Sequence, residues 1–309
     1  MWDVTDMVRS ACARVAAQAR SVNIEYAAIP AYAAALPLAE PAGGPDPEHL
    51  VTGSAEVLAA FWLTLDAINF GSGWFPTLRK RGGRSGYHTV AGGVRERFEA
   101  AGPWAAHELA SLGADEIADV LGEDPGHELM ALFAASLNDL GRHVAHDYDG
   151  RFLAVVDGAE GSAVTLAGQL GGWDCFADVS TYGGFAVPFF KRAQIVAADL
   201  ADGGVVRWRD RGRLTMFADN LVPHVLRLDG VLRFAPDLLA RINRGELIEH
   251  DSPEEVEIRA CAVHAVELII AARADESVSA ATVDRVLWTR GGGSSYKSEP
   301  RHRSRCTAY

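Results

Sequence analysis

One carboxylate stands among apolar neighbours in the last third of the chain, and its type and position suit chemistry. Asp219 lies in the run of residues 214–232, with Met216 and Phe217 before it and Leu221 after it. A proline follows four residues on, so the pattern is typical of a turn that feeds an amphipathic helix. An acid at a helix start is stabilised as an anion, and an anion beside apolar walls can stabilise a developing cation. The alternative is that Asp219 only caps the helix.

The composition limits what surrounds this acid. The chain has 309 residues, of which 49% are hydrophobic and 23% are charged. This is typical of a globular protein with one large core or two closely packed lobes, so we expect a single domain over residues 1–309. No run approaches the roughly 18 apolar residues that a membrane span needs. A net charge of −12 disfavours stable binding of long nucleic acid, whereas a small anionic ligand needs only a few local basic groups.

The cysteines and the first residues bear on the compartment. The chain starts with an acidic stretch followed by a helix that carries several arginines, which favours neither a signal peptide nor a transit peptide. The cysteines form no C-x-x-C pair, which fits reduced thiols better than a disulfide framework or a zinc site. We therefore predict a cytoplasmic protein. The four cysteines are Cys12, Cys175, Cys261 and Cys306.

Several patterns that suggest cofactors have simpler interpretations. His143 and His146 precede two acids, but histidines at the end of a helix are typical of a surface, and no H-E-x-x-H occurs. The glycine-rich pieces match neither a dinucleotide fingerprint nor a P-loop, and no serine stands in a G-x-S-x-G context. The basic loop of residues 79–86 could close over a phosphate or be a solvated turn. We expect no metal and no organic cofactor.

The periodicity predicts a mainly α fold with at most a small β element. Apolar residues recur at helical spacing over most of the chain, and only residues 152–156 and 205–208 look like strands. Ser252, with Pro253 at the first helical position and Glu255 three residues after the cap, predicts a helix as far as about Ala272. Within it, Glu255 and Arg259 are spaced to pair. The other predicted helices cover residues 3–19, 54–70, 89–100, 103–112, 114–121 and 126–148.

Longer motifs resemble a known family. The segment DVSTYGGFAVPFFKRAQIVAADL at residues 178–200 and LTMFAD at residues 214–219 are similar to two signatures of the queuosine salvage family, the queuosine 5'-phosphate N-glycosylase/hydrolases. The resemblance extends to LDAINF at residues 65–70, EVEIRAC at residues 255–261 and HRSRCTAY at residues 302–309. It therefore covers nearly the whole chain.

The resemblance implies an all-helical fold similar to that of helix-hairpin-helix DNA glycosylases. It also implies hydrolysis of queuosine 5'-monophosphate to queuine and ribose 5-phosphate, and a segment 291–309 that packs back on the fold. The chain departs from the family at Thr289, where relatives have a second acid after the Leu-Trp pair, and at Asn220 and His224. Asp284 is then the acid that remains near that pair.

This chemistry gives two acids a role. Breaking an N-glycosidic bond builds positive charge on the ribose, which a carboxylate can stabilise or attack, and Asp219 is our choice for that group. Asp199, near the end of the preceding helix, could orient water, protonate the leaving base or hold the turn.

The remaining candidates bind substrate. Lys191, which begins a helix together with Arg192, could meet the 5'-phosphate, meet a buried acid or be part of a solvated pair. Phe217 and Trp74 could stack on a flat deazaguanine or belong to the core. Asp284 could contact the cyclopentenediol or its amine.

Two other functions stay open. One is a glycosylase of the helix-hairpin-helix type that acts on nucleic acid, which would need a basic face. The other is a noncatalytic protein that binds queuine without turnover.

Overall fold

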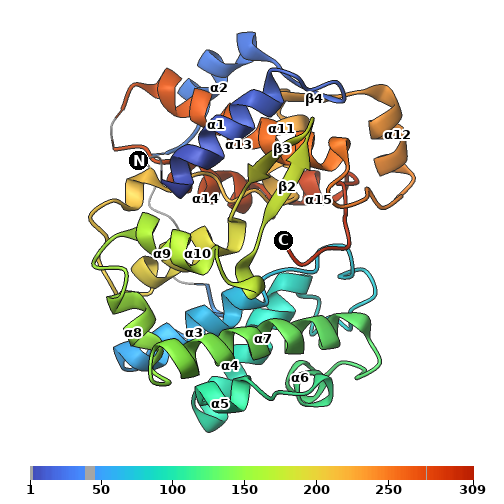
Figure 1. Ribbon diagram of the computed structural model, residues 1–309. Coiled ribbons are helices and arrows are strands. Elements are labelled where there is room, and N and C mark those ends of the chain that lie inside the picture. Colours follow the sequence, from blue (N-terminus) through green and yellow to red (C-terminus); the bar gives the residue numbers. More distant parts are fainter. Residues whose placement is uncertain (1–2, 39–45, 276) are drawn as a thin grey trace.

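The computed structural model describes residues 3–38, 46–275 and 277–309, and these residues are mainly helical (Figure 1). The prediction of a mainly α fold with a small β element is confirmed. The helices are α1 (Val4–Ala16), α2 (Ile29–Ala35), α3 (Ala55–Ala67), α4 (Gly86–Ala101), α5 (Ala106–Leu109), α6 (Ala114–Leu121), α7 (Glu128–Asp147), α8 (Phe152–Asp157), α9 (Ala163–Leu170), α10 (Lys191–Asp202), α11 (Leu221–Leu228), α12 (Pro236–Asn243), α13 (Pro253–Arg273), α14 (Ala280–Gly291) and α15 (Ser294–Lys297), with 3-10 turns at Tyr26–Ala28, Asp174–Phe176 and Arg211–Arg213.

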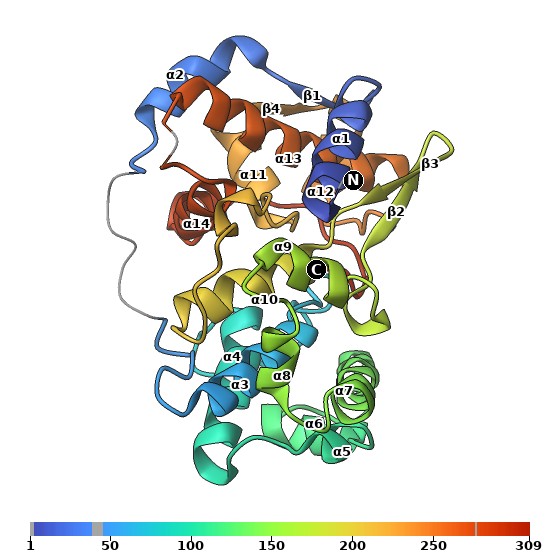
Figure 2. The ribbon, with the colours of Figure 1, turned by 60° about the vertical axis from the view of Figure 1, so that its left-hand side comes forward.

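The helices form two groups that meet at α10. In Figures 1 and 2 the upper group contains α1, α2 and α11–α15, and the lower group contains α3–α8. In the upper group α13 packs against α1 and α2, and α11 packs against α14. Helix α10 packs against α3 of the lower group and against α9. Helix α9 in turn packs against α1 of the upper group, so α9 and α10 connect the two groups.

Two small antiparallel sheets accompany the helices. Strand β1 (Val22–Ile24) pairs with β4 (Leu232–Phe234), and β2 (Val179–Tyr182) pairs with β3 (Phe185–Pro188). The β2–β3 hairpin turns through Gly183 and Gly184, whose φ angles of 54° and 82° suit a two-residue hairpin loop. The periodicity of the sequence did not predict this hairpin.

Both strands that the sequence predicted are wrong. Residues 152–156 form most of α8, because Glu56 of α3 accepts the free N–H groups of Phe152 and Leu153 at 2.7 and 2.9 Å and so stabilises a helix start. Residues 205–208 follow the end of α10, where the Val205 N–H bonds the Leu200 carbonyl, and they pair with no described strand. Periodicity alone does not separate a short apolar helix from a strand.

The predicted serine cap of α13 is confirmed, but the Glu255 side chain accepts the N–H of Asp251 at 3.2 Å instead of that of Ser252. The Ser252 hydroxyl accepts the N–H of Glu255 at 3.3 Å, Pro253 occupies the first turn, and the helix ends at Arg273. The expected pair also forms, with Arg259 Nη1 3.7 Å from Glu255 Oε1.

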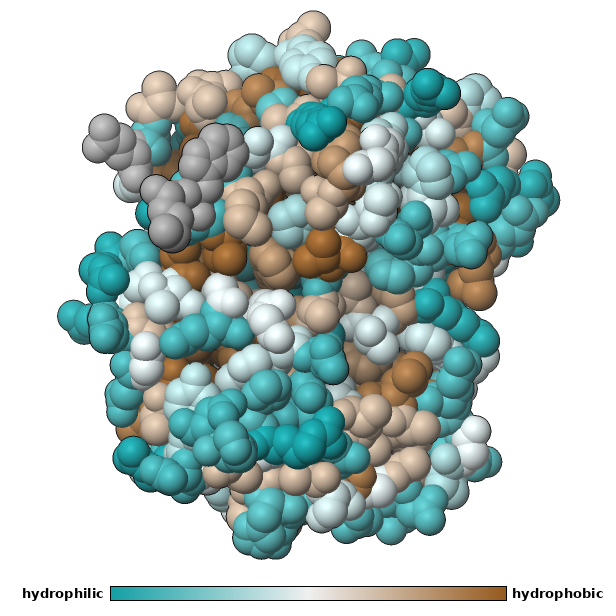
Figure 3. Space-filling model, viewed as in Figure 1, coloured by the Kyte–Doolittle hydropathy of each residue, from teal (hydrophilic) through white to brown (hydrophobic). Residues whose placement is uncertain are grey.

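One cluster of buried apolar side chains extends from α1 to α14. On the face drawn in Figure 3, hydrophobic residues form small separate patches, some of them at the level where the two groups meet. No described helix is long and apolar enough to cross a membrane. A single domain stays a prediction.

The last residues pack on the fold, as the family resemblance implied. Tyr309 is buried, and its carbonyl accepts the N–H of Gly71 at 3.1 Å. Any side chain at Gly73 would overlap the backbone at Ser304, so this close approach requires glycine.

Candidate active site

Asp219 both caps a helix and keeps one oxygen available. Its Oδ1 accepts the N–H groups of Leu221 and Val222 at 2.9 and 3.0 Å, at the start of α11. Its Oδ2 makes no hydrogen bond with any described residue. The side chain is half-buried, and burial raises the pKa of the carboxyl above its usual value, although nearby Lys191 opposes this. The two interpretations of Asp219 are therefore compatible.

Lys191 is a buried cation beside this acid. Its Nζ donates to the carbonyl of Asn69 at 2.9 Å, and the side chain is 5% exposed. Burial lowers the pKa of Lys191 to about 8, and the negative charge of Asp219 is the main opposing influence. Arg192 is also buried and donates to the Ala67 carbonyl at 2.6 Å. The interpretation as a solvated pair is therefore wrong, because both side chains are buried and donate to backbone carbonyls. Lys191 forms no ion pair with a described acid, so its pairing with a buried acid stays a prediction.

Two further acids lie near Lys191. Asp66 of α3 is fully buried, with Oδ1 accepting from Asn69 at 3.2 Å and Oδ2 unpartnered among the described residues. Asp199 is half-buried, and its side chain bonds no described residue. Burial, followed by the charge of Asp66, raises the pKa of Asp199 well above its usual value. The proton-donor role considered for Asp199 is consistent with this shift.

Asp284 and Phe217 are joined by a hydrogen bond. Asp284 of α14 accepts the backbone N–H of Phe217 at 3.1 Å, two residues before Asp219. Burial and then the charge of Asp219 raise the pKa of Asp284 well above its usual value. The Phe217 ring is half-buried. The structure thus brings together five of the six predicted site residues: Asp219, Asp199, Lys191, Phe217 and Asp284.

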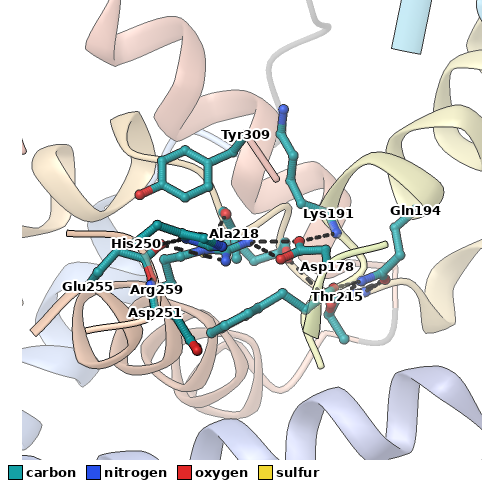
Figure 4. Close-up of polar contacts among 12 residues, drawn as sticks. Asp178, Lys191, Gln194, Thr215, Ala218, His250, Asp251, Glu255, Arg259 and Tyr309 are labelled. Carbon is teal, nitrogen blue, oxygen red and sulfur yellow. Dashed lines mark hydrogen bonds and ion pairs between the residues drawn. The ribbon is translucent and has the colours of Figure 1, made fainter. Parts of the chain in front are cut away.

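A buried arginine fixes the backbone on both sides of this group (Figure 4). Arg259 of α13 donates from Nε to the carbonyl of Ala218 at 2.9 Å and from Nη2 to both oxygens of Asp178 at 2.9 and 2.7 Å. Asp178 in turn accepts the N–H of Lys191 at 3.0 Å. One guanidinium therefore links the residue before Asp219 to the first residue of α10.

Further contacts hold the Arg259 guanidinium and the segment that leads to Asp219. The centre of the Arg259 guanidinium lies 3.9 Å from the ring centroid of Phe189 and 4.7 Å from that of Tyr309. Gln194 of α10 accepts the N–H of Thr215 at 2.8 Å and donates to its hydroxyl at 2.9 Å. These contacts restrict the backbone that carries the site.

Comparison with known proteins bears on the same residues. Residues 49–309 match the queuosine salvage protein family, and this range holds every residue of the group around Asp219. The chain belongs to that family.

Three relatives share the printed name queuosine 5'-phosphate N-glycosylase/hydrolase. The protein of Sphaerobacter thermophilus is 36% identical over 265 residues, 82% of each chain. That of Bos taurus is 29% identical over 73% of this chain and 72% of its own. That of Dictyostelium discoideum is 29% identical over 84% of this chain and 80% of its own.

One predicted site residue of this queuosine salvage family member lies outside the group. Trp74 is 4% exposed, and its indole N–H donates to Glu128 of α7 at 2.7 Å. Arg305 lies over its ring at 5.8 Å. These contacts favour the core interpretation, and stacking of Trp74 on a substrate stays a prediction without structural support.

The structure adds residues that the sequence analysis did not assign. Tyr87 of α4 lies near Asp199 and Asp66, whose charges follow burial as causes that raise the tyrosine pKa. Its hydroxyl is 2.6 Å from His49, and its ring is 6.1 Å from that of Trp288 on α14. Asp178, Arg259 and Asp66 lie inside the family motifs, and this position was the one sign in the sequence that they belong to the site. The spacing of Arg259 indicated only its pair with Glu255.

Proposed function

We propose that this chain hydrolyses the N-glycosidic bond of queuosine 5'-monophosphate and releases queuine and ribose 5-phosphate. The relatives' shared name supports this substrate. The observation that carries the proposal is the carboxylate of Asp219, whose Oδ1 is fixed by two backbone N–H groups while Oδ2 makes no bond with the described residues. A fixed anion with one free oxygen suits a reaction in which positive charge develops.

The reaction breaks the bond between the anomeric carbon and the base nitrogen. The bonding electrons leave with the base, and the ribose becomes an oxocarbenium ion. Asp219 Oδ2 faces that charge, and the nearby ammonium of Lys191 favours the ionised form of the carboxyl. The hydroxyl of a water molecule ends on the anomeric carbon, and a proton ends on the base.

The other acids supply the proton and bind the base. We assign proton transfer to Asp199, because burial and the charge of Asp66 raise its pKa and so favour the protonated form that a proton donor needs. Asp284, similarly raised, contacts the polar substituent of the base, and Phe217 stacks on its plane. Water and these side chains complete the reaction, so it requires no metal and no organic cofactor.

The partner is a single nucleotide. The net charge of −12 opposes the close approach of many phosphates, which disfavours stable binding of nucleic acid. The cytoplasm stays a prediction, with which the four free, buried cysteines are compatible.

A mass-spectrometric assay for free queuine tests the function. The protein is incubated with queuosine 5'-monophosphate, with queuosine and with queuosine-containing tRNA. We expect fast release from the monophosphate and much slower release from tRNA. Comparable rates on tRNA, together with tight and salt-sensitive binding of nucleic acid, would favour the nucleic-acid glycosylase. Binding of queuine without release from any substrate would favour the noncatalytic alternative.

A further inference from the structure

The segment after α15 brings one arginine to the site. Asn220, the residue after Asp219, donates from its side chain to the carbonyl of His302 at 3.1 Å. Arg227 of α11 donates to the carbonyl of Pro300 at 3.2 Å. The residue between these two anchored carbonyls is Arg301. Asn220 and α11, which directly follow Asp219, thus hold the backbone on both sides of Arg301.

The Arg301 guanidinium has no partner in the described part of the chain. Its side chain is half-buried, yet it forms no hydrogen bond and no ion pair there, including none with Asp219. Arg192 and Arg259 differ from it, because they are fully buried and each donates to a carbonyl and lies over aromatic rings. Burial lowers the pKa of Arg301, and the charge of Asp219 is the main opposing influence. A half-buried guanidinium with no protein partner keeps its donors available, and an anionic ligand could accept charge-assisted hydrogen bonds from them.

A second guanidinium lies close to the first. His302 and Ser304 are buried, whereas Arg301 and Arg303 are half-buried. Burial alternates along this segment, as it does where alternate residues lie on the same side, so the two arginines lie on one side of it. The charge of Arg303 is also one of the influences that lower the pKa of Arg301. The Arg303 side chain also bonds no described residue. Two neighbouring guanidinium groups match the geometry and charge of a phosphate.

We propose that Arg301, assisted by Arg303, binds the 5'-phosphate of the nucleotide. This inference rests on the proposed function, which places the anomeric carbon at Asp219. The 5'-phosphate lies across the ribose from that carbon. The cation that binds the phosphate must therefore be near Asp219 but not paired with Asp219, and Arg301 meets both conditions. Lys191 fits less well, because its ammonium is already bound to the Asn69 carbonyl and is almost fully buried.

The test compares two substrates in Arg301→Ala. We measure kcat/KM for queuosine 5'-monophosphate and for queuosine, and take their ratio as the preference for phosphate. Loss of charge-assisted hydrogen bonds should lower this ratio roughly 10- to 100-fold. Arg301→Lys, which keeps the charge but not the fork of donors, should fall between. Arg305→Ala is the matched control, because Arg305 is on the same segment but is exposed and pairs with Glu128. It should keep the wild-type ratio.

A binding measurement separates this inference from the proposed function. Calorimetry with ribose 5-phosphate should show binding to wild type and to Arg305→Ala, and at least tenfold weaker binding to Arg301→Ala. A wild-type protein that releases queuine, with an unchanged preference in Arg301→Ala, would overturn the phosphate assignment alone. Equal losses on both substrates would also overturn it, because they indicate an effect through Asp219 or the fold. No queuine release by wild type would refute the function, whatever the calorimetry shows.

Discussion

Replacing Asp219 by asparagine separates its two roles. The amide oxygen of asparagine can still accept the N–H groups of Leu221 and Val222, which Asp219 Oδ1 accepts at 2.9 and 3.0 Å. The substitution removes the negative charge at Oδ2, which makes no bond with the described residues. We therefore expect Asp219→Asn to keep the fold and to lose turnover.

The magnitudes follow from these contacts. A cap of this kind contributes about 1 kcal/mol to stability, and asparagine retains most of it. Loss of a fixed group that faces developing charge typically raises the barrier by roughly 2.7–4 kcal/mol, or about 100- to 1000-fold in rate. Asp219→Ala is the matched variant, since it removes the charge and the cap together. Its rate loss should be similar, with an additional loss of about 1–2 kcal/mol in unfolding free energy.

The assay combines rate, fold and binding. Single-turnover release of queuine from the monophosphate gives the chemical step, urea unfolding followed by circular dichroism gives stability, and titration with queuine shows that the site is intact. If folded Asp219→Asn retains more than about a tenth of the wild-type rate, the barrier change is below roughly 1.4 kcal/mol. Asp219 would then be only a cap, and Asp199 would be the next candidate.

Three further outcomes follow from the buried charges. With a pKa of about 8, Lys191 should lose its charge as the pH rises, so wild-type kcat/KM should fall above about pH 8. Lys191→Arg should move this fall in kcat/KM to higher pH. A fall at an unchanged pH would exclude Lys191 as its origin. Burial raises the pKa of Asp66 to about 7, so its contribution to stability is present below about pH 4 and is lost as the pH rises through 7. The unfolding free energy of Asp66→Asn, measured in urea, should therefore rise relative to that of wild type by on the order of a few kcal/mol as the pH increases from 5 to 8. A difference in unfolding free energy that stays constant with pH would contradict this. Arg259→Ala leaves Asp178 buried without its cation and should lower the unfolding free energy by roughly 3–5 kcal/mol; a loss below about 1 kcal/mol would show that the link does not hold the site.

Local sequence signals predicted two of the helices that begin with a serine cap, whereas α9 and α14, which also begin with one, were not predicted. Ser54 and Ser252 accept N–H groups within their own first turns, so the start of α3 and of α13 depends on neighbours in the chain. The run around Asp219 likewise indicated a carboxylate at a helix start, because one side chain and the next two N–H groups suffice for it. The position of these elements was therefore predictable from residues a few places apart.

Long-range contacts determined the rest. Residues 152–156 are helical because the carboxylate of Glu56 in α3 accepts the N–H groups at the start of this helix. The apolar pattern of these residues does not indicate that distant acceptor. The sequence identified Lys191 and Asp219 as candidates, but their proximity depends on Arg259, which joins Asp178 to the Ala218 carbonyl across three distant segments.

The sequence by itself determined the helical periodicity, the caps and the types of side chain available for chemistry. The tertiary structure decided which of these charges are buried and which have partners. Burial and pairing set the pKa of an acid or a lysine, and both depend on atoms brought together by packing rather than by spacing along the chain. For the same reason, only the folded chain shows that Arg301 lies near Asp219 and has no partner among the described residues.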